Sequence, residues 1–381
     1  MMNTRLAIAS LALTLFGCGG GSSAPPTPTA VETTLNLDLQ NLANYAAPAL
    51  PLYYDASVLA TDNTPGTDPV DDKIATLGRV LFYDTKLSVN NAISCAGCHL
   101  QAQGFGDVNR FSLGFSGAAF TDAHAMRLGN LRFFKSGRMF WNQRAASVEE
   151  QASQPIQHPV EMGFDSTAGG LSALFTKMRT LPYYPELFTF AFGDATITEA
   201  RLQRALAQFQ RAMVSVNSKW DSAYASVYNP ALPDKGLGLP LAGLSAQEDR
   251  GRALFMLSPQ QGGMGCAACH VPPSFALAAG VGGIGLDAGE TTIFKAPSLK
   301  NVGLGSAFMH DGRFSTLEQV VDHYAGGVQA GPALDPSLLG PGGTPRQFNL
   351  SVAEKAGLVA FMRSLTDPVF TTDARFSNPF K

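Results

Sequence analysis

The chain has 381 residues, a formal net charge of −3 at pH 7 and only 15% charged residues. It carries no basic patch, which argues against nucleic acid as a partner. Its 39 glycines and 24 prolines favour a loop-rich backbone. About 330 residues remain once an N-terminal export signal and tether are set aside, and this length suits two domains.

The N-terminus has the pattern of an export signal. A short basic start precedes the apolar run Leu6–Phe16, which is too short to span a bilayer, and Gly17 and Cys18 come after it. Residues 1–17 are therefore predicted to be a signal peptide of lipoprotein type, because the sequence around Cys18 resembles a bacterial lipobox. The alternative is an ordinary signal peptide that is cut nearby. Residues 18–45 begin rich in Gly, Ser, Pro and Thr and are expected to form a flexible tether.

The expected location depends on this N-terminus. No second apolar run reaches the length of a membrane span, so the lipid on Cys18 is predicted to be the only membrane attachment. The folded part is expected in the periplasm, anchored to a membrane, with the outer membrane favoured.

Four of the five cysteines occur in two copies of C-x-x-C-H, at residues 95–99 and 266–270. In this signature of c-type haem attachment, two thiols form thioethers to the porphyrin and the adjacent histidine ligates the iron. A single zinc site or a thioredoxin-like redox site fits poorly, because each copy carries its own histidine and neither has a βαβ context. The sequence therefore predicts two covalently bound haems c. The expected attachment residues and proximal ligands are Cys95, Cys98, His99, Cys266, Cys269 and His270.

A helix is predicted before each haem motif. Gly78–Phe82 and Gly251–Phe255 share the pattern G-R-x-L-F, and each closes an amphipathic stretch of helical period. The first stretch begins near Asp71 and the second at Ser245, which starts a capping box with Glu248. A helix followed by C-x-x-C-H and by loops around a buried haem is the plan of a cytochrome c domain.

The repeat extends beyond the haem motifs. Phe140–Arg144 parallels Met309–Arg313, and a helix is predicted to begin after each, at Ser147 and at Thr316. Between the copies, Ile197–Tyr228 is predicted to be one long helix with an apolar face that serves the core. No region is rich in strands. The predicted fold is mainly α, with two tandem cytochrome c-like domains that each enclose one c-type haem.

Composition predicts the domain boundaries. Asn229–Gly243 is rich in Pro, Gly and Leu and is predicted to link the two copies. The N-terminal cytochrome c-like domain is placed at residues 46–235 and the C-terminal one at residues 236–381.

The two copies differ where a second axial ligand could stand. When Arg144 and Arg313 are aligned, Tyr324 falls opposite Pro155, and proline has no ligating side chain. Tyr324 is therefore favoured as the sixth ligand of the second haem, while the first is left open. The alternatives are His323 and Met309. Adjacent helix residues point about 100° apart, so His323 and Tyr324 cannot both face the iron.

Polar residues near Pro155 suit chemistry at an open haem. Glu161 lies between apolar neighbours, and a carboxylate in such a pocket can accept a proton from one peroxide oxygen and deliver it to the other. Gln151 could orient peroxide by hydrogen bonding. The alternatives are a surface loop for Glu161 and an exposed helix face for Gln151. Trp141 is expected to assist electron transfer between the haems, with core packing as the alternative.

The remaining candidates have weaker signals. Arg144 and Arg313 are predicted to pair with haem propionates, because a guanidinium matches a carboxylate in a bidentate way. His124 and His158 could approach the open haem, although loop histidines more often lie at the surface.

These residues resemble the bacterial di-haem cytochrome c peroxidases and the MauG-like di-haem enzymes, over about residues 73–366. The stretches that carry the resemblance are Ser94–His99, Phe140–Ala145, Glu149–Ala152, Pro159–Gly163, Ala296–Val302 and His310–Tyr324.

The resemblance implies a peroxidatic first haem with Gln151 and Glu161 as its distal pair, and Trp141 between the haems. It also implies a second haem that supplies electrons. Peroxidases of the family commonly carry methionine at the place of Tyr324, whereas MauG-like members carry tyrosine. The loop of residues 111–120 contains no histidine. An open first haem that needs no reductive activation is therefore expected, unless His124 covers it.

The predicted function is reduction of hydrogen peroxide to water at the N-terminal haem, with electrons delivered through the C-terminal haem. The expected donor is a small periplasmic c-type cytochrome or cupredoxin. The alternatives are a MauG-like oxidase that modifies tryptophan in a partner protein and a non-catalytic di-haem electron-transfer cytochrome. The inter-domain calcium site of the family is not clearly matched, so calcium is left open as a cofactor. A homodimer is left open as well.

Overall fold

The computed structural model describes residues 28–381, so the predicted signal peptide and Cys18 lie outside the described residues. Within that range the chain forms α-helices, short 3₁₀ turns and one two-stranded antiparallel ladder. The prediction of a mainly helical fold is confirmed. No helix in the described range combines the length and the apolar character needed to cross a bilayer.

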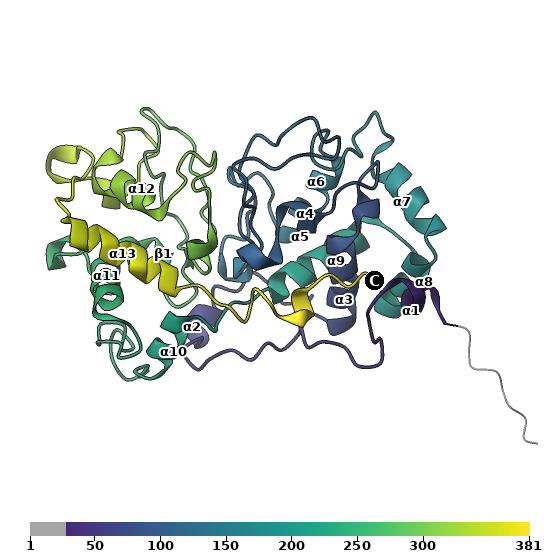
Figure 1. Cartoon of the computed structure of the whole chain (residues 1–381), viewed down its shortest axis with the longest axis horizontal. Coiled ribbons are helices and arrows are strands. Elements are labelled where there is room, and N and C mark those ends of the chain that lie inside the picture. The colour runs from purple at the N-terminus through teal and green to yellow at the C-terminus, as the bar shows by residue number, and fades with distance from the viewer. Residues whose placement is uncertain (1–27) are drawn as a thin grey trace, which may run out of the picture.

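The linker predicted at residues 229–243 divides the helices by their order in the sequence, and Figure 1 shows their arrangement in space. Those before the linker are α1 Ala30–Thr34, α2 Ala56–Leu59, α3 Asp72–Tyr83, α4 Cys95–Cys98, α5 Val148–Ala152, α6 Gln154–Gln157, α7 Gly170–Thr180, α8 Tyr183–Phe192, α9 Glu199–Ala212 and α10 Lys219–Ala225. Those after it, with the ladder, are α11 Ala246–Met256, β1 His270–Val271, β2 Ala276–Leu277, α12 Leu317–Asp322 and α13 Val352–Ser364.

A pair of closely packed helices forms the centre of each half. Helix α3 packs on α9, and α11 packs on α13. The glycine of the G-R-x-L-F pattern stands at each contact. A Cβ on Gly78 would lie 1.9 Å from the carbonyl oxygen of Ala205, and one on Gly251 would lie 1.8 Å from that of Gly357. Only a residue without a side chain permits such an approach, so the sequence repeat corresponds to a repeat in packing.

The backbone repeats as well. Asn130 and Asn301 occupy equivalent places with φ of 61° and 65°, and Phe140 and Met309 do so with φ of 66° and 71°. Positive φ is uncommon for residues other than glycine, so two such matches indicate one architecture used twice. An isolated bridge encloses each segment that begins at Phe140 or Met309.

The long helix predicted over residues 197–228 is wrong in one respect, because it is broken into α9 and α10. The apolar face that includes Leu202, Leu206 and Phe209 is buried as expected. Beyond α9 the backbone leaves the helix and bonds to distant groups: Ser215 N–H donates to Asn130 Oδ1 at 2.7 Å. Ser218 then starts α10 with a capping box. These tertiary hydrogen bonds replace those of a continuous helix.

Part of the segment expected as a tether is packed. Helix α1 starts at a capping box on Thr29, and Val31 and Leu35 are buried in the same core as α3 and α9. The tether prediction is therefore wrong for residues 30–35, because their apolar side chains find a place against α8.

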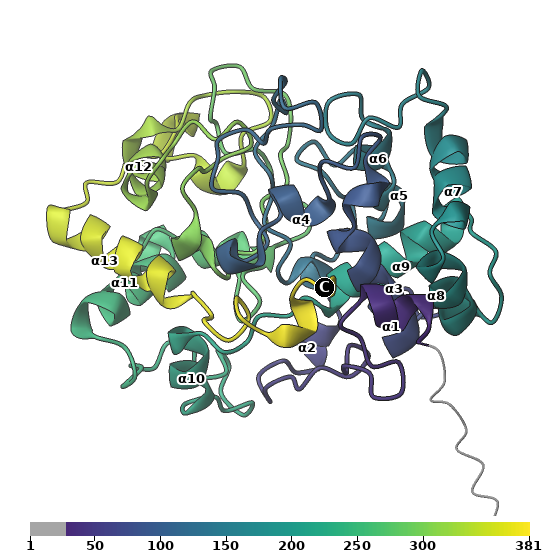
Figure 2. The same cartoon turned by 45° about the vertical axis from the view of Figure 1, so that its right-hand side comes forward.

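The two hydrophobic cores exchange segments of chain. Phe370 and Phe376, which lie beyond α13, are buried in the core of the first half. In return, Tyr53 and Tyr54 are buried with Trp220 in the core of the second half. The final segment runs back from α13 towards α3 and α1 (Figures 1 and 2). Asp55, the N-cap of α2, accepts a hydrogen bond from Tyr228, which comes after α10. The predicted domain boundary at residue 235 therefore does not separate the two hydrophobic cores.

Candidate functional site

The two C-x-x-C-H motifs begin on short helical turns. Residues 95–98 form α4, and residues 266–268 form a 3₁₀ turn that leads into β1. In each motif the first two residues after the cysteine continue the turn, which gathers both thiols and the histidine at one cavity. Each predicted set of attachment residues is thus brought together around a cavity of its own.

The first cavity has a volume of about 70 Å³. The predicted site residues that line it are Cys95, Cys98, His99, Gln151, Pro155 and Glu161. Gln151 is on α5 and Pro155 on α6, two short helices that are adjacent in the chain. The structure therefore brings the predicted distal residues to the same cavity as the first haem motif.

Glu161 is the carboxylate of the first cavity. Its side chain keeps 27% of its surface exposed. Burial raises the pKa of Glu161, and the nearby charges of His158 and Arg144 oppose that rise. The His158 Nδ1 lies 4.0 Å from the carboxylate and accepts the backbone N–H of Glu161 at 3.3 Å. Glu161 is thus a carboxyl group whose proton is held more firmly than in water.

The loop of residues 111–120 holds the Glu161 loop in place. Phe115 N–H donates to the carbonyl oxygens of Val160 and Glu161, at 3.2 and 3.1 Å. A Cβ on Gly114 would lie 1.9 Å from the Val160 carbonyl oxygen, so the two loops are in tight contact. This contact fixes the backbone from which the Glu161 side chain projects.

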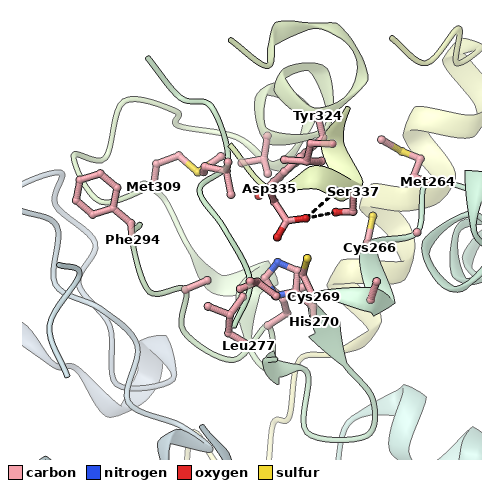
Figure 3. A pocket seen from close by; sticks show the side chains of 18 of the residues that line it. Met264, Cys266, Cys269, His270, Leu277, Phe294, Met309, Tyr324, Asp335 and Ser337 are labelled. Carbon is pink, nitrogen blue, oxygen red and sulfur yellow. Dashed lines mark hydrogen bonds between the residues drawn. The ribbon is translucent and has the colours of Figure 1, made fainter. Parts of the chain in front are cut away.

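The second cavity is larger, about 520 Å³, and mostly apolar. Cys266, Cys269 and His270 form one side of it (Figure 3). Tyr324 enters from the other side, with Met309 nearby. Burial raises the pKa of Tyr324 well above its usual range, so its hydroxyl is neutral in this pocket.

The three candidates for the sixth ligand are separated by this geometry. Tyr324 and Met309 line the second cavity, but His323 does not. The Nε2 of His323 instead lies 3.1 Å from the carbonyl oxygen of Ile284. The helix widens into a π-turn over His323–Gly327, a deviation that is frequent at functional sites. The structure therefore brings Tyr324 to the second cavity and turns His323 away from it.

The two motif histidines have different partners. The Nδ1 of His99 lies 3.0 Å from the Phe105 carbonyl oxygen, and because a carbonyl only accepts, Nδ1 carries the proton and Nε2 keeps a free lone pair. The Nδ1 of His270 is buried without a hydrogen-bond partner in the described part of the chain. Burial lowers the pKa of His270 to about 4, so its imidazole is neutral and suited to ligate a metal.

Trp141 stands at the junction of the two halves. Its indole N–H donates to the carbonyl oxygen of His124 at 2.7 Å, and its ring meets His310 edge-on at 6.5 Å. All three residues line the second cavity. His124 therefore lies on the second cavity, and it does not line the first one, where it was considered as a cover.

The predicted propionate partners do not line either cavity. Arg144 is exposed and stacks on the Phe140 ring at 3.4 Å. Arg313 is bound by two carboxylates, Asp287 at 2.7 Å and Asp311 at 2.8 Å. Their proposed role thus gains no support from the geometry.

Three other cations line the second cavity and were missed from the sequence, namely Lys295, Arg127 and Arg346. Lys295 is 3% exposed, and burial alone lowers its pKa to about 8. The Nε of Arg127 is buried and has no acceptor within residues 28–381. A buried cation without a partner carries a large desolvation cost. A bound group with carboxylates would relieve that cost, so these cations are better placed as partners for propionates than Arg144 and Arg313 are.

The donor sets fit haem c at both motifs. Each supplies two thiols and a neutral imidazole. The second adds Arg127, whose Nε has no acceptor within residues 28–381, and Lys295, at a cavity of about 520 Å³, within the ~300–1,000 Å³ usual for such ligands. The first cavity is smaller than that range. Within the described chain, no group of three or more His, Cys, Asp or Glu side chains is placed to hold a further metal ion.

Comparison with known proteins agrees with this geometry. A profile of the family described as di-haem cytochrome c peroxidase matches residues 72–228. Methylamine utilization protein MauG of Methylorubrum extorquens is 30% identical over 372 residues, which cover 93% of this chain and 94% of the relative. Cytochrome c551 peroxidase of Nitrosomonas europaea is 28% identical over 364 residues, covering 88% of this chain and 92% of the relative.

A solved structure is also similar over nearly its whole length. The crystal structure of a MauG-like protein associated with microbial copper homeostasis has a TM-score of 0.69 and 27% identity, covering 87% of this chain and 99% of that chain. The chain belongs to the family of di-haem cytochrome c peroxidases and MauG proteins. Two covalently bound haems c are what membership of a di-haem family implies.

Proposed function

We propose that this protein reduces hydrogen peroxide to water at the first site, with electrons that arrive through the second. The observation that carries this proposal is the meeting of Glu161, Gln151 and Pro155 at the cavity of the first haem motif. Pro155 offers no ligand atom, whereas the equivalent Tyr324 projects into the second cavity.

The bound haem would be held by Cys95, Cys98 and His99, and it would supply the iron at which peroxide and electrons meet. Gln151 orients peroxide by hydrogen bonding. Glu161 takes a proton from one peroxide oxygen and returns it to the other oxygen, which departs as water. The raised pKa of Glu161 favours this second task, because a carboxyl that holds its proton more firmly is available as an acid closer to neutral pH.

At the second site, Cys266, Cys269 and His270 would hold the haem, with Tyr324 as its sixth ligand. Lys295 and Arg127 would neutralise the propionates. Trp141, which touches His310 at the junction of the halves, would connect the two sites for electrons. Full coordination suits electron transfer, because it leaves no position for peroxide.

A second candidate function is oxidation of a partner protein, as in MauG-like enzymes. It is favoured by Tyr324, which stands where peroxidases of the family commonly carry methionine, and by the similarity to MauG of Methylorubrum extorquens. The periplasmic location, the lipid on Cys18 and a small cytochrome or cupredoxin as donor belong to the proposal as well.

The resting electron paramagnetic resonance spectrum and a steady-state peroxide assay test the proposal. We expect one high-spin and one low-spin haem. Two low-spin haems without a spectral response to peroxide would instead indicate an electron-transfer cytochrome.

Glu161→Gln is expected to lower peroxide turnover by about 100-fold or more, the scale of general acid–base catalysis, with unchanged haem content. The matched control is Glu150→Gln, an exposed residue of α5 whose carboxylate caps the Ala146 N–H, a bond that glutamine can replace. Normal turnover in Glu161→Gln would refute the assigned role.

A further inference from the structure

A run of aromatic rings leads away from the histidine of the second haem motif. The Phe255 ring lies 6.5 Å from that of His270, between ring centres. Phe275 is next, at 5.9 Å from Phe255, and Trp220 lies 4.8 Å from Phe275. Trp220 is fully buried. The second haem motif is thus connected by packed rings to a buried tryptophan.

The run continues to the surface through tyrosines. Tyr224 stacks on Trp220 at 4.9 Å, and Tyr228 lies 5.9 Å beyond it. The centre of the Tyr53 ring lies 6.3 Å from that of Trp220, 5.1 Å from that of Tyr224 and 6.2 Å from that of Tyr228. Tyr53 and Tyr224 are buried, whereas Tyr228 is partly exposed. Four rings that can be oxidised therefore link the core of the second half to solvent.

Two of these tyrosines donate to carboxylates. The Tyr228 hydroxyl donates to Asp55 Oδ2 at 3.0 Å, and the Tyr53 hydroxyl donates to Asp221 Oδ1 at 3.1 Å. A phenol that loses an electron becomes a strong acid, so a hydrogen-bonded carboxylate can receive its proton even though Lys235 lowers the pKa of Asp55. Both tyrosines therefore have the proton acceptor that one-electron oxidation requires.

Trp220 is suited to pass an electron and not to hold a radical. Its indole N–H is buried and has no acceptor in the described chain, so oxidised Trp220 could not release its proton. The ammonium of Lys300 lies 4.9 Å from the ring, but it is paired with Asp221 at 2.5 Å, so the pair adds no net charge. An oxidising equivalent on Trp220 is thus expected to move on to a tyrosine.

The tyrosines reached through Phe82 in the first half, Tyr83 and Tyr45, donate to backbone carbonyls and not to carboxylates. Phe82 and Phe105 repeat the places of Phe255 and Phe275, with Phe82 at 6.5 Å from His99. Phe82 lies 5.4 Å from Phe209 and 5.4 Å from Tyr83, and Phe209 lies 6.1 Å from Tyr45. The Tyr45 hydroxyl donates to the carbonyl oxygen of Arg375, which cannot take a proton. The partly exposed tyrosine there, Tyr83, donates to the carbonyl oxygen of Phe376, which cannot take a proton.

We propose that Trp220, Tyr224, Tyr53 and Tyr228 form a redox relay that connects the second haem to a one-electron reductant at the surface beside Tyr228. The inference rests on the proposed peroxide chemistry. Reduction of one hydrogen peroxide to two water molecules takes two electrons and two protons, and solvent supplies both protons. Tyr228 supplies one electron through Tyr224 and Trp220, and its phenolic proton passes to Asp55. The other electron comes from the reduced donor. The surface reductant then returns an electron to the Tyr228 phenoxyl radical, and Asp55 returns the proton.

The test uses the full-length holoprotein, reduced beforehand by one electron and mixed with one equivalent of hydrogen peroxide. Radicals are recorded by electron paramagnetic resonance after freezing, and a nitroso spin trap combined with peptide mass spectrometry locates them. We expect a tyrosyl signal with the trap attached to Tyr228. Tyr228→Phe should remove the adduct at residue 228, and Asp55→Asn should lower its yield because the proton acceptor is lost.

Tyr83→Phe is the matched control, because Tyr83 is also partly exposed but lies in the first half without a carboxylate partner. It should leave the radical unchanged. Haem absorbance and peroxide consumption are measured in the same samples. Peroxide consumption without a radical at Tyr228, or an adduct at Tyr83, overturns the relay alone. Absence of any reaction with peroxide overturns the proposed function and the relay together.

Discussion

The two haem-motif cavities differ in the segment that comes after the paired arginines of the repeat. After Arg144 the chain forms α5 and α6 and presents Pro155, with Gln151 and Glu161, to the first cavity. After Arg313 it forms α12 and a π-turn, and presents Tyr324 to the second. The helix pairs that carry the two sites are alike, so a change at one position decides whether a ligand atom is available. Under the proposed function, a duplicated scaffold would thus separate chemistry from electron supply without a change of fold.

The largest effect is expected when the first cavity is given a ligating side chain at the position of Pro155. In Pro155→Tyr the first cavity gains the phenol that the second one has, and peroxide turnover should fall to background because the binding position is taken. The high-spin signal should be replaced by a second low-spin signal. Gln157→Tyr, on the same short helix but outside the residues that line the cavity, is the control. Retained high-spin signal in Pro155→Tyr would show that this position does not face the iron.

The next largest effect is expected from pH. Since burial raises the pKa of Glu161 above its usual range, its carboxylate form is lost as pH falls through a higher value than for an ordinary glutamate. The value of kcat/KM for peroxide should then fall by about tenfold per pH unit below that pKa. Glu161→Gln should lack this fall of kcat/KM at low pH. A fall that persists in the variant would mean that another group titrates.

Opening the second site is the reverse experiment. Tyr324→Phe keeps the ring that fills the cavity but removes its oxygen, so the low-spin signal of the second haem should change while the first is unaffected. An unchanged spectrum would favour Met309, which lines the same cavity.

The smallest effect compares the two helix contacts. Gly78→Ala and Gly251→Ala place a Cβ within 1.9 and 1.8 Å of a carbonyl oxygen, so each should destabilise its half by about 1–3 kcal/mol. Thermal unfolding measures this, with Gly66→Ala as a control, because a Cβ there meets no atom within 4 Å and the backbone is not left-handed. Equal losses would confirm that the glycines do the same task, and no loss in one would mean that its helices can separate.

Local signals in the sequence were enough for several features. The haem motifs, the G-R-x-L-F helices and the capping boxes at Ser245 and Thr316 depend on neighbours in the chain, and the structure has those helices and boxes. The contrast of Pro155 with Tyr324 came from alignment of the repeat. His323 could be separated from Tyr324 only with the structure, because its contact with Ile284 joins residues 39 positions apart.

Features that depend on distant contacts were beyond sequence reasoning. The break after α9 is made by bonds to Asn130, and the burial of α1 by contact with α8. Lys295 and Arg127 carry no motif, so only their place at the second cavity marks them. The aromatic run combines Tyr53 with residues more than 160 positions later.

The exchange of core segments constrains how this protein is made. A chain is synthesised from its N-terminus, and domains generally fold as they emerge. Here the core that contains α3 and α9 also needs Phe370 and Phe376, each 2% exposed, and burying such a side chain is worth about 1.5–3 kcal/mol. The chain must therefore be present as far as residue 376 before that core is complete, so the first half cannot finish folding ahead of the C-terminal segment.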